Sequence, residues 1–182
     1  MHWIAKTGIT GILFLSVCCE KLPVIDLTNS LDLVHADENG VIMPALVFYP
    51  DSVIVEKGAS FLLEIHAMVV DSISGAQLQV KFDPNYFSIL NAEAGTIFSG
   101  TTSPLFFFTS DTSKGTVEII TANMGIDSLK SVSGTGQLAK IELEVIRDGH
   151  NTIEFSTDSR FVDAVDRAIT INSFLTAKIF AN

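Results

Sequence analysis

One short stretch of this chain, residues 75–84, limits the possible fold more than any other. Apolar residues stand at every second position, as expected for a strand with one buried face: Ala76, Leu78, Val80 and Phe82. Asp83-Pro84 then ends the strand, because proline has no amide hydrogen and its φ is fixed. Residues 137–145 show the same alternation, with apolar residues on one face and charged residues on the other. One-sided strands of this kind predict a sheet that packs against a second layer.

From Pro44 onward, short runs of strand-forming residues follow one another, and no segment keeps a helical period across three turns. The expected strands are residues 45–49, 52–55, 60–70, 75–82, 87–92, 105–110, 116–123, 137–146, 152–156, 161–164, 169–171 and 175–180. Many short strands with turns between them and no helices predict an all-β chain. We expect a two-sheet antiparallel β-sandwich.

Two of these runs carry more apolar residues than one buried face can hold. In residues 60–70 we assign every second residue from Phe61 to the core, ending at Val69. The apolar residues Leu62, Met68 and Val70 are then left on the opposite face. The run Phe106-Phe107-Phe108 must likewise place at least one ring outward. A loop or a neighbouring strand covers such residues, or they form an exposed apolar patch of the kind that marks a partner site.

The N-terminus has the pattern of an export signal. Residues 1–17 carry one charge, Lys6, before a short apolar run, which is typical of a secretory signal peptide and too short to span a membrane. The run ends at Cys18-Cys19, the only two cysteines of the chain. We expect a signal peptide over residues 1–19 with Cys18 or Cys19 lipidated; ordinary secretion and a retained anchor remain alternatives. Residues 20–43 have no sustained period and are expected to be a tether to a folded domain over residues 44–182.

Composition and motifs give little support to catalysis or to a cofactor. The formal net charge of −10 would repel phosphate backbones, which excludes nucleic acid as an expected partner. No catalytic, phosphate-binding or zinc-binding motif is present, and the acidic residues near Asp111 and Asp163 do not match a calcium-binding loop. His66 shares a strand face with Glu64, but no nucleophile is placed beside this pair. We therefore expect neither an enzyme nor a resident metal or cofactor.

Three motifs, in this order, resemble the cohesin domain. They are the aromatic-Asp-Pro ending Phe82-Asp83-Pro84, a following strand that ends at Gly95, and the segment from Gly134 to Ile141 that reads Gly-x-Gly-x-Leu-Ala-x-Ile. The resemblance covers roughly residues 44–178 and narrows the sandwich to a nine-stranded jelly roll. It implies a non-catalytic module that docks a secreted protein carrying a dockerin-like module, with any calcium on the partner's side. Together with the expected lipidation of Cys18 or Cys19, this predicts a module anchored by a lipid in a bacterial cell envelope.

The resemblance also implies that one sheet face binds the partner. If strands 60–70, 75–82, 116–123 and 137–146 supply that face, the outward residues are Glu64, His66, Met68, Gln77, Gln79, Glu118, Ile120, Lys140 and Glu142. In well-known dockerin-binding members, an Asp stands six positions before the Asp of Asp-Pro and accepts hydrogen bonds from the partner. Here that position is Gln77, and Gly75 replaces the polar residue two before it, so the partner's identity stays open.

A carbohydrate-binding module of the same jelly-roll fold is the alternative function, with a polysaccharide as the partner. Such modules present rows of Trp or Tyr to sugar rings. This chain has Trp3 in the expected signal peptide, and its two tyrosines are Tyr49 and Tyr86. The thirteen phenylalanines suit a buried core better than a wet sugar platform.

Overall fold

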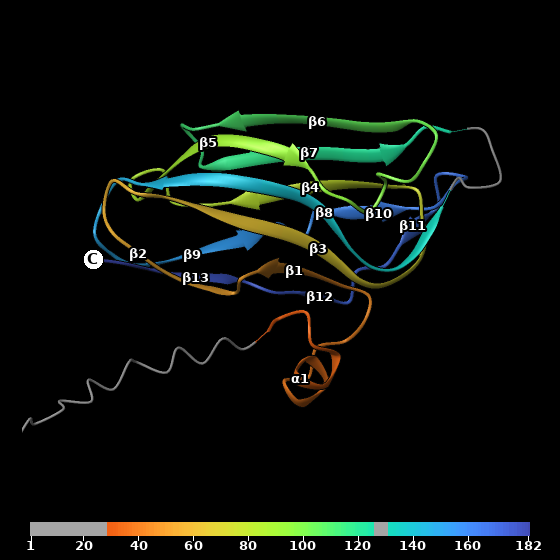
Figure 1. Ribbon diagram of the computed structural model, residues 1–182, viewed down its shortest axis with the longest axis horizontal. Coiled ribbons are helices and arrows are strands. Elements are labelled where there is room, and N and C mark those ends of the chain that lie inside the picture. Colours follow the sequence, from red (N-terminus) through yellow and green to blue (C-terminus); the bar gives the residue numbers. More distant parts are fainter. Residues whose placement is uncertain (1–28, 126–130) are drawn as a thin grey trace, which may run out of the picture.

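The computed structural model describes residues 29–125 and 131–182, and within them the chain forms one short helix and thirteen strands (Figure 1). The elements are α1 (Leu33–Glu38), β1 (Ala45–Tyr49), β2 (Ser52–Val55), β3 (Ser60–Ile73), β4 (Gly75–Lys81), β5 (Phe87–Ala94), β6 (Pro104–Asp111), β7 (Thr116–Asn123), β8 (Val132–Val145), β9 (Gly149–Phe155), β10 (Arg160–Val162), β11 (Ala168–Ile169), β12 (Ser173–Phe174) and β13 (Ala177–Ala181). The predicted strands 45–49, 52–55 and 116–123 have the predicted bounds. The short strand β12 was not predicted.

The strands form two facing sheets. One has the order β12-β1-β3-β8-β5, and the other has the order β11-β10-β4-β9-β13-β2, with β7 on the remaining side of β4 and β6 beyond β7. The pairs are antiparallel except β1 with β12 and β2 with β13, which are parallel. This arrangement is the two-sheet sandwich that the sequence predicts, with the short strands β10, β11 and β12 added to the longer ones of the jelly roll.

The inward faces of both sheets meet in one apolar core. Ala76, Leu78 and Val80 of β4 lie in this core, as their alternation predicts. Across the sandwich, the rings of Phe48 and Phe155 stack with centroids 4.0 Å apart. The hydrophobic effect, which favours removing these side chains from water, is the main contribution that holds the two sheets together.

Gly95 shows why a glycine follows β5. A Cβ on this residue would lie 2.2 Å from the carbonyl oxygen of Gln137, so no larger residue fits without moving the backbone of β8. The amide of Gly95 donates to the carbonyl of Leu138 at 3.0 Å. The glycine that ends the second motif and the Leu-Ala pair of the third motif are thus neighbours in space.

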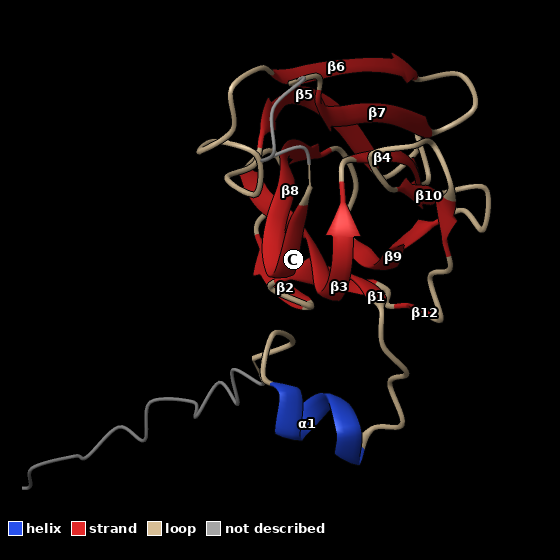
Figure 2. Cartoon of the chain, turned by 90° about the vertical axis from the view of Figure 1, so that its right-hand side faces the viewer, coloured by secondary structure: helices blue, strands red, loops and turns tan. Residues whose placement is uncertain are grey.

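Residues 29–43 pack against the sandwich, which corrects the expectation of a tether for this part of the chain. The side chain of Asp32 accepts a hydrogen bond from the amide of Val34 and so begins α1. Ala36 of this helix and Met68 of β3 are buried in a second cluster outside the main core; its other members are Leu31, Val41, Met43, Ala45, Val47 and Leu175. Figure 2 shows α1 beneath β1 and away from β6 and β7. Local apolar residues in an otherwise polar stretch supply this packing.

A bulge in β3 reverses the expected burial of two residues. The register between β3 and β8 shifts after Ala67, and Val69 adopts a positive φ of 49°. Val69 is therefore exposed, and Val70 enters the core instead. The prediction that Val69 faces inward and Val70 outward is wrong, because an extra residue in one strand shifts its alternation by one position.

The expected signal peptide, Cys18 and Cys19 lie outside the described residues. Among the residues that are described, no helix is long and apolar enough to cross a membrane.

Candidate functional site

An apolar strip crosses the outer face of the second sheet on strands β6 and β7. Phe107 is 56% exposed and lies opposite Ile120, which is 37% exposed. Leu105 lies next in line, opposite Ala122. Phe106 and Phe108 point the other way and pack against the core. Of the two alternatives for apolar residues on the outer face, the second holds for Phe107, because its ring is exposed and not covered by a loop or a strand.

Strands β4 and β10 continue this face beyond β7. Gln77 lies opposite Ile120 of β7 on one side and Arg160 of β10 on the other, so that Phe107, Ile120, Gln77 and Arg160 form one row across four strands. We call this surface the β6–β7–β4–β10 face; its outward residues are Leu105, Phe107, Thr109, Glu118, Ile120, Ala122, Gly75, Gln77, Gln79, Arg160 and Val162. An apolar strip bordered by polar groups is the usual composition of a protein-binding surface.

Three polar side chains on this face are joined by hydrogen bonds. The Nε2 of Gln77 donates to Oε1 of Glu118 at 2.6 Å, and the Nε of Arg160 donates to Oε1 of Gln77 at 3.0 Å. Gln77 therefore sits between a carboxylate and a guanidinium, and these bonds fix the orientation of its amide. Glu118 thus places a carboxylate beside Gln77, which stands at the position where the resemblance implies an Asp.

The structure divides the predicted contact residues between the two sheets. Gln77, Gln79, Glu118 and Ile120 lie together on the β6–β7–β4–β10 face. The remaining predicted residues lie on β3 and β8, which pair with each other in the other sheet: Glu64, His66, Met68, Lys140 and Glu142. The expectation of a single face is therefore wrong. Met68 is also fully buried beneath residues 29–43, so its side chain is not exposed on the outer face of β3.

Glu64 and His66 form a pair on the other sheet, as their spacing suggests. The His66 Nε2 and Glu64 Oε2 atoms are 2.9 Å apart, and His66 is largely buried. Burial raises the pKa of Glu64, but hydrogen bonds from His66 and Gln137 outweigh this effect, and the pKa is lowered overall. The carboxyl group is therefore held as an anion, which suits an acceptor in a structural hydrogen bond better than a general acid.

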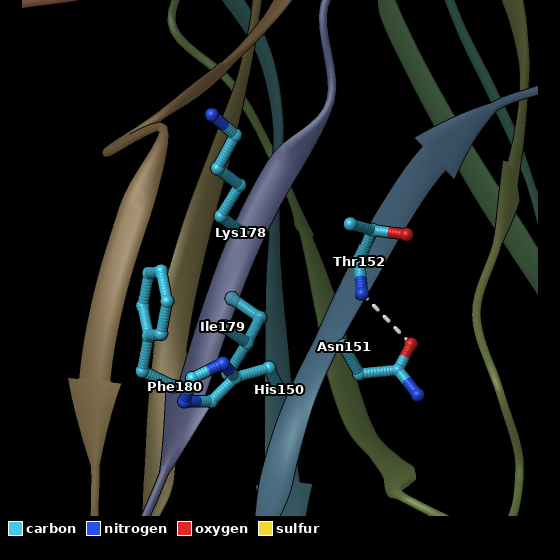
Figure 3. A pocket seen from close by; sticks show the side chains of 6 residues that line it. All are labelled: His150, Asn151, Thr152, Lys178, Ile179 and Phe180. Carbon is cyan, nitrogen blue, oxygen red and sulfur yellow. Dashed lines mark hydrogen bonds between the residues drawn. The ribbon is translucent and has the colours of Figure 1, made fainter.

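A shallow hollow of about 410 Å³ lies on strands β9 and β13 (Figure 3). The rings of His150 and Phe180 meet edge to face there, with centroids 4.8 Å apart. Lys178 and Thr152 stand opposite each other on the two strands and add polar groups. His150 is not among the predicted site residues, since a histidine beside the turn residue Gly149 carries no signal of its own.

The acidic residues considered for calcium hold turns instead. The Oδ1 of Asp163 accepts from the amides of Val165 and Arg167, and its Oδ2 accepts from the Arg167 side chain. Asp111 accepts from Ser113 and from the amide of Lys114 in the turn between β6 and β7. Across the described ranges, no group of three potential ligand side chains is close enough to hold a metal ion.

Comparison with known proteins agrees with this architecture. The family model of the cohesin domain matches residues 49–175. A type II cohesin domain from the cellulosome of Acetivibrio cellulolyticus aligns with a TM-score of 0.64 and 18% identity, covering 74% of this chain and 92% of the other. A non-cellulosomal cohesin from the archaeon Archaeoglobus fulgidus aligns with a TM-score of 0.61 and 13% identity, covering 76% and 90%.

A third similar structure is a type I cohesin–dockerin complex from Clostridium thermocellum, with a TM-score of 0.61, 15% identity and coverage of 76% and 98%. No curated protein matches the sequence. The matched family model covers most of the sandwich, and the strand order and motif contacts are those of a single jelly roll. The chain belongs to the cohesin domain family.

Proposed function

We propose that this chain is a non-catalytic binding module that docks a dockerin-type module of a secreted protein on the β6–β7–β4–β10 face. The observation that carries the proposal is the exposed strip formed by Phe107, Ile120 and Leu105 beside the hydrogen-bonded side chains of Gln77, Glu118 and Arg160. Protein-binding surfaces commonly have large apolar side chains at the centre and polar groups at the border, and a few of the central residues supply most of the binding energy.

The other sheet offers a less suitable surface. Residues 29–43 cover the outer side of β1 and part of β3, including Met68. The uncovered part, around Lys140 and Glu142, is mainly charged, and its exposed apolar residues Leu62 and Leu90 lie on the separate strands β3 and β5. The position of Gln77, six residues before the Asp of Asp-Pro, also favours the β6–β7–β4–β10 face, because the resemblance places the partner-facing Asp there.

The anchor and the location are proposed from the N-terminal sequence. A signal peptide over residues 1–19, with a lipid on Cys18 or Cys19, would export the chain and hold it at the bacterial cell envelope. Mass spectrometry of the mature protein tests this directly, because a lipid on one cysteine adds a defined mass to an N-terminal peptide that begins there.

A carbohydrate-binding module remains the second candidate, and the hollow of β9 and β13 favours it. Phe180 and His150 offer ring surfaces, and Lys178 and Thr152 offer hydrogen-bonding groups beside them (Figure 3). Affinity electrophoresis in gels that contain a soluble polysaccharide tests this candidate. Retardation of the wild type that is lost in Phe180→Ala would support it, and equal mobility in all gels would exclude the polysaccharides tested.

The experiment for the docking proposal uses residues 20–182 and a panel of purified dockerin modules, with calcium and with chelator. We expect at least one module to bind in calcium, and the double variant Gln77→Lys/Glu118→Lys to lose that binding while melting at the same temperature. Glu142→Lys is the control, since it makes on the other sheet the same substitution that Glu118→Lys makes on this face. If Glu142→Lys abolishes binding and the double variant does not, the partner uses the other face.

A further inference from the structure

The β6–β7–β4–β10 face is hollowed where β4 and β7 carry their smallest outward residues. Gly75 of β4 lies opposite Ala122 of β7, and Val162 of β10 lies opposite Gly75 on the other side. These residues, with Ile120, Arg160 and Asp166, line a hollow of about 150 Å³. The floor and nearest walls are backbone, methyl groups and aliphatic side chains, so the hollow suits an apolar group.

Gly75 keeps this hollow open. Its φ lies outside the left-handed region, so the backbone there is one that any residue can adopt. A Cβ on Gly75 would lie 3.1 Å from Cγ2 of Val162 and 3.3 Å from Cβ of Ala122. Both distances are shorter than ordinary van der Waals contact. A larger side chain at position 75 would therefore crowd these two neighbours and also reduce the space that an approaching group could enter.

The network beside the hollow leaves two charged groups available to a partner. Both hydrogen-bonding ends of the Gln77 amide are used, one by Glu118 and one by Arg160. These bonds use Oε1 of Glu118 and Nε of Arg160, and both side chains are exposed. Oε2 of Glu118 and the terminal nitrogens of Arg160 are therefore the polar atoms that a partner would contact, in place of the amide of Gln77.

The spacing along β7 matches that of a helix laid on it. Ala122, Ile120 and Glu118 point outward at every second residue, which separates neighbours by about 6.7 Å. Residues four apart on an α-helix are about 6 Å apart along its axis and share one face. A single helix can thus reach the hollow, the Phe107–Ile120 strip and Glu118 with three side chains.

We propose that the hollow at Gly75 and Ala122 is a socket for one aliphatic side chain of a helix in the partner. The same helix presents an apolar residue to Phe107 and Ile120 and a lysine or arginine to Glu118, at successive intervals of four residues. A basic group is the complement to Glu118 on a chain whose net charge is −10. This inference rests on the proposed docking function and deepens it, because it states which partner features are recognised.

The test measures dissociation constants for every dockerin module of the panel that binds residues 20–182. We expect Gly75→Leu to weaken binding about tenfold or more, because it fills the socket. We expect Glu118→Gln to weaken binding and to flatten its dependence on salt. Gly100→Leu is the matched control, since a Cβ on Gly100 contacts nothing within 4 Å. Ala122→Leu fills the same space from β7 and replaces Gly75→Leu if the melting temperature shows that the latter does not fold.

The outcomes separate the inference from the function on which it rests. Two findings together support both the socket and the docking function. The modules that bind carry the aliphatic, apolar and basic pattern, and their binding is weakened by Gly75→Leu and Ala122→Leu but not by Gly100→Leu. If Phe107→Lys abolishes binding but Gly75→Leu and Ala122→Leu leave it unchanged, the socket is wrong. The proposal that the partner docks on the β6–β7–β4–β10 face then still holds. A panel in which no module binds, with calcium or without it, overturns the docking function and the socket with it.

Discussion

Replacing Met68 by alanine tests whether residues 29–43 are an integral part of the domain. Met68 is fully buried, with residues 29–43 packed over it and β1 beside it. In residues 20–182, we expect Met68→Ala to lower the free energy of unfolding by about 2–5 kcal/mol, the cost of removing a buried side chain and leaving a cavity. In a chain that begins at Pro44, the same position lies at the surface, and the cost should fall to about 0.5 kcal/mol or less.

The measurement is urea unfolding followed by far-UV circular dichroism on both lengths of chain, since the only tryptophan, Trp3, lies in the expected signal peptide. Ile65→Val is the control, because Ile65 lies on the same strand but is fully buried in the main core. Its cost of about 0.5–1.5 kcal/mol should be the same in both lengths. An equal cost of Met68→Ala in the two chains would refute the reasoning, because Met68 would then gain nothing from residues 29–43.

Three further predictions follow from other parts of the structure. Gly95→Ala should cost about 1–3 kcal/mol or prevent folding, because its Cβ collides with β8, whereas Gly100→Ala should be neutral in the same thermal melts. Val80→Asp should unfold the domain, since it places a carboxylate in the core at a fully buried position; an unchanged melting curve would contradict the strand register. Hydrogen bonds from Ser113 and Lys114 lower the pKa of Asp111 to about 2, so the stability that this carboxylate gives is complete above its ordinary pKa and lost as the pH falls through about 2. In an NMR titration of the carboxyl carbons, Ser113→Ala should raise the pKa of Asp111 and leave that of Asp163 unchanged.

The strands and the inward faces of β4 and β8 could be predicted because alternation is a local property. The side of the strand on which each residue of Leu78–Val80 lies can be predicted from its polarity and its position in the alternation, without knowing which strands pair with β4. The same signal failed in β3, where the bulge at Val69 shifts the alternation without any glycine or proline to mark it. Helix α1 was missed because its six residues are too few to show a helical period.

The candidate face was only half predicted because sheet membership depends on pairing between distant residues. Alternation places Glu118 and Glu142 outward with equal confidence, but only the three-dimensional pairing puts one on β7 and the other on β8 of the opposite sheet. Arg160 and Gly75 were not predicted as site residues for the same reason, since β10 pairs with β4 although the two strands are far apart in the sequence. The run Phe106-Phe107-Phe108 indicates that at least one ring faces outward, but which ring does so depends on the pairing of β6 with β7.

The two parallel strand pairs govern when the sandwich can close. β1 pairs with β12 and β2 pairs with β13, so strands from the two ends of the described chain complete both sheets. Until β13 is in place, β2 and β9 have no strand between them, and the core around Ile179 is open to water. Pairing over such sequence separations makes folding slow, in the range of about milliseconds to seconds. The sandwich therefore cannot close until β13, the last strand of the described chain, has been synthesised.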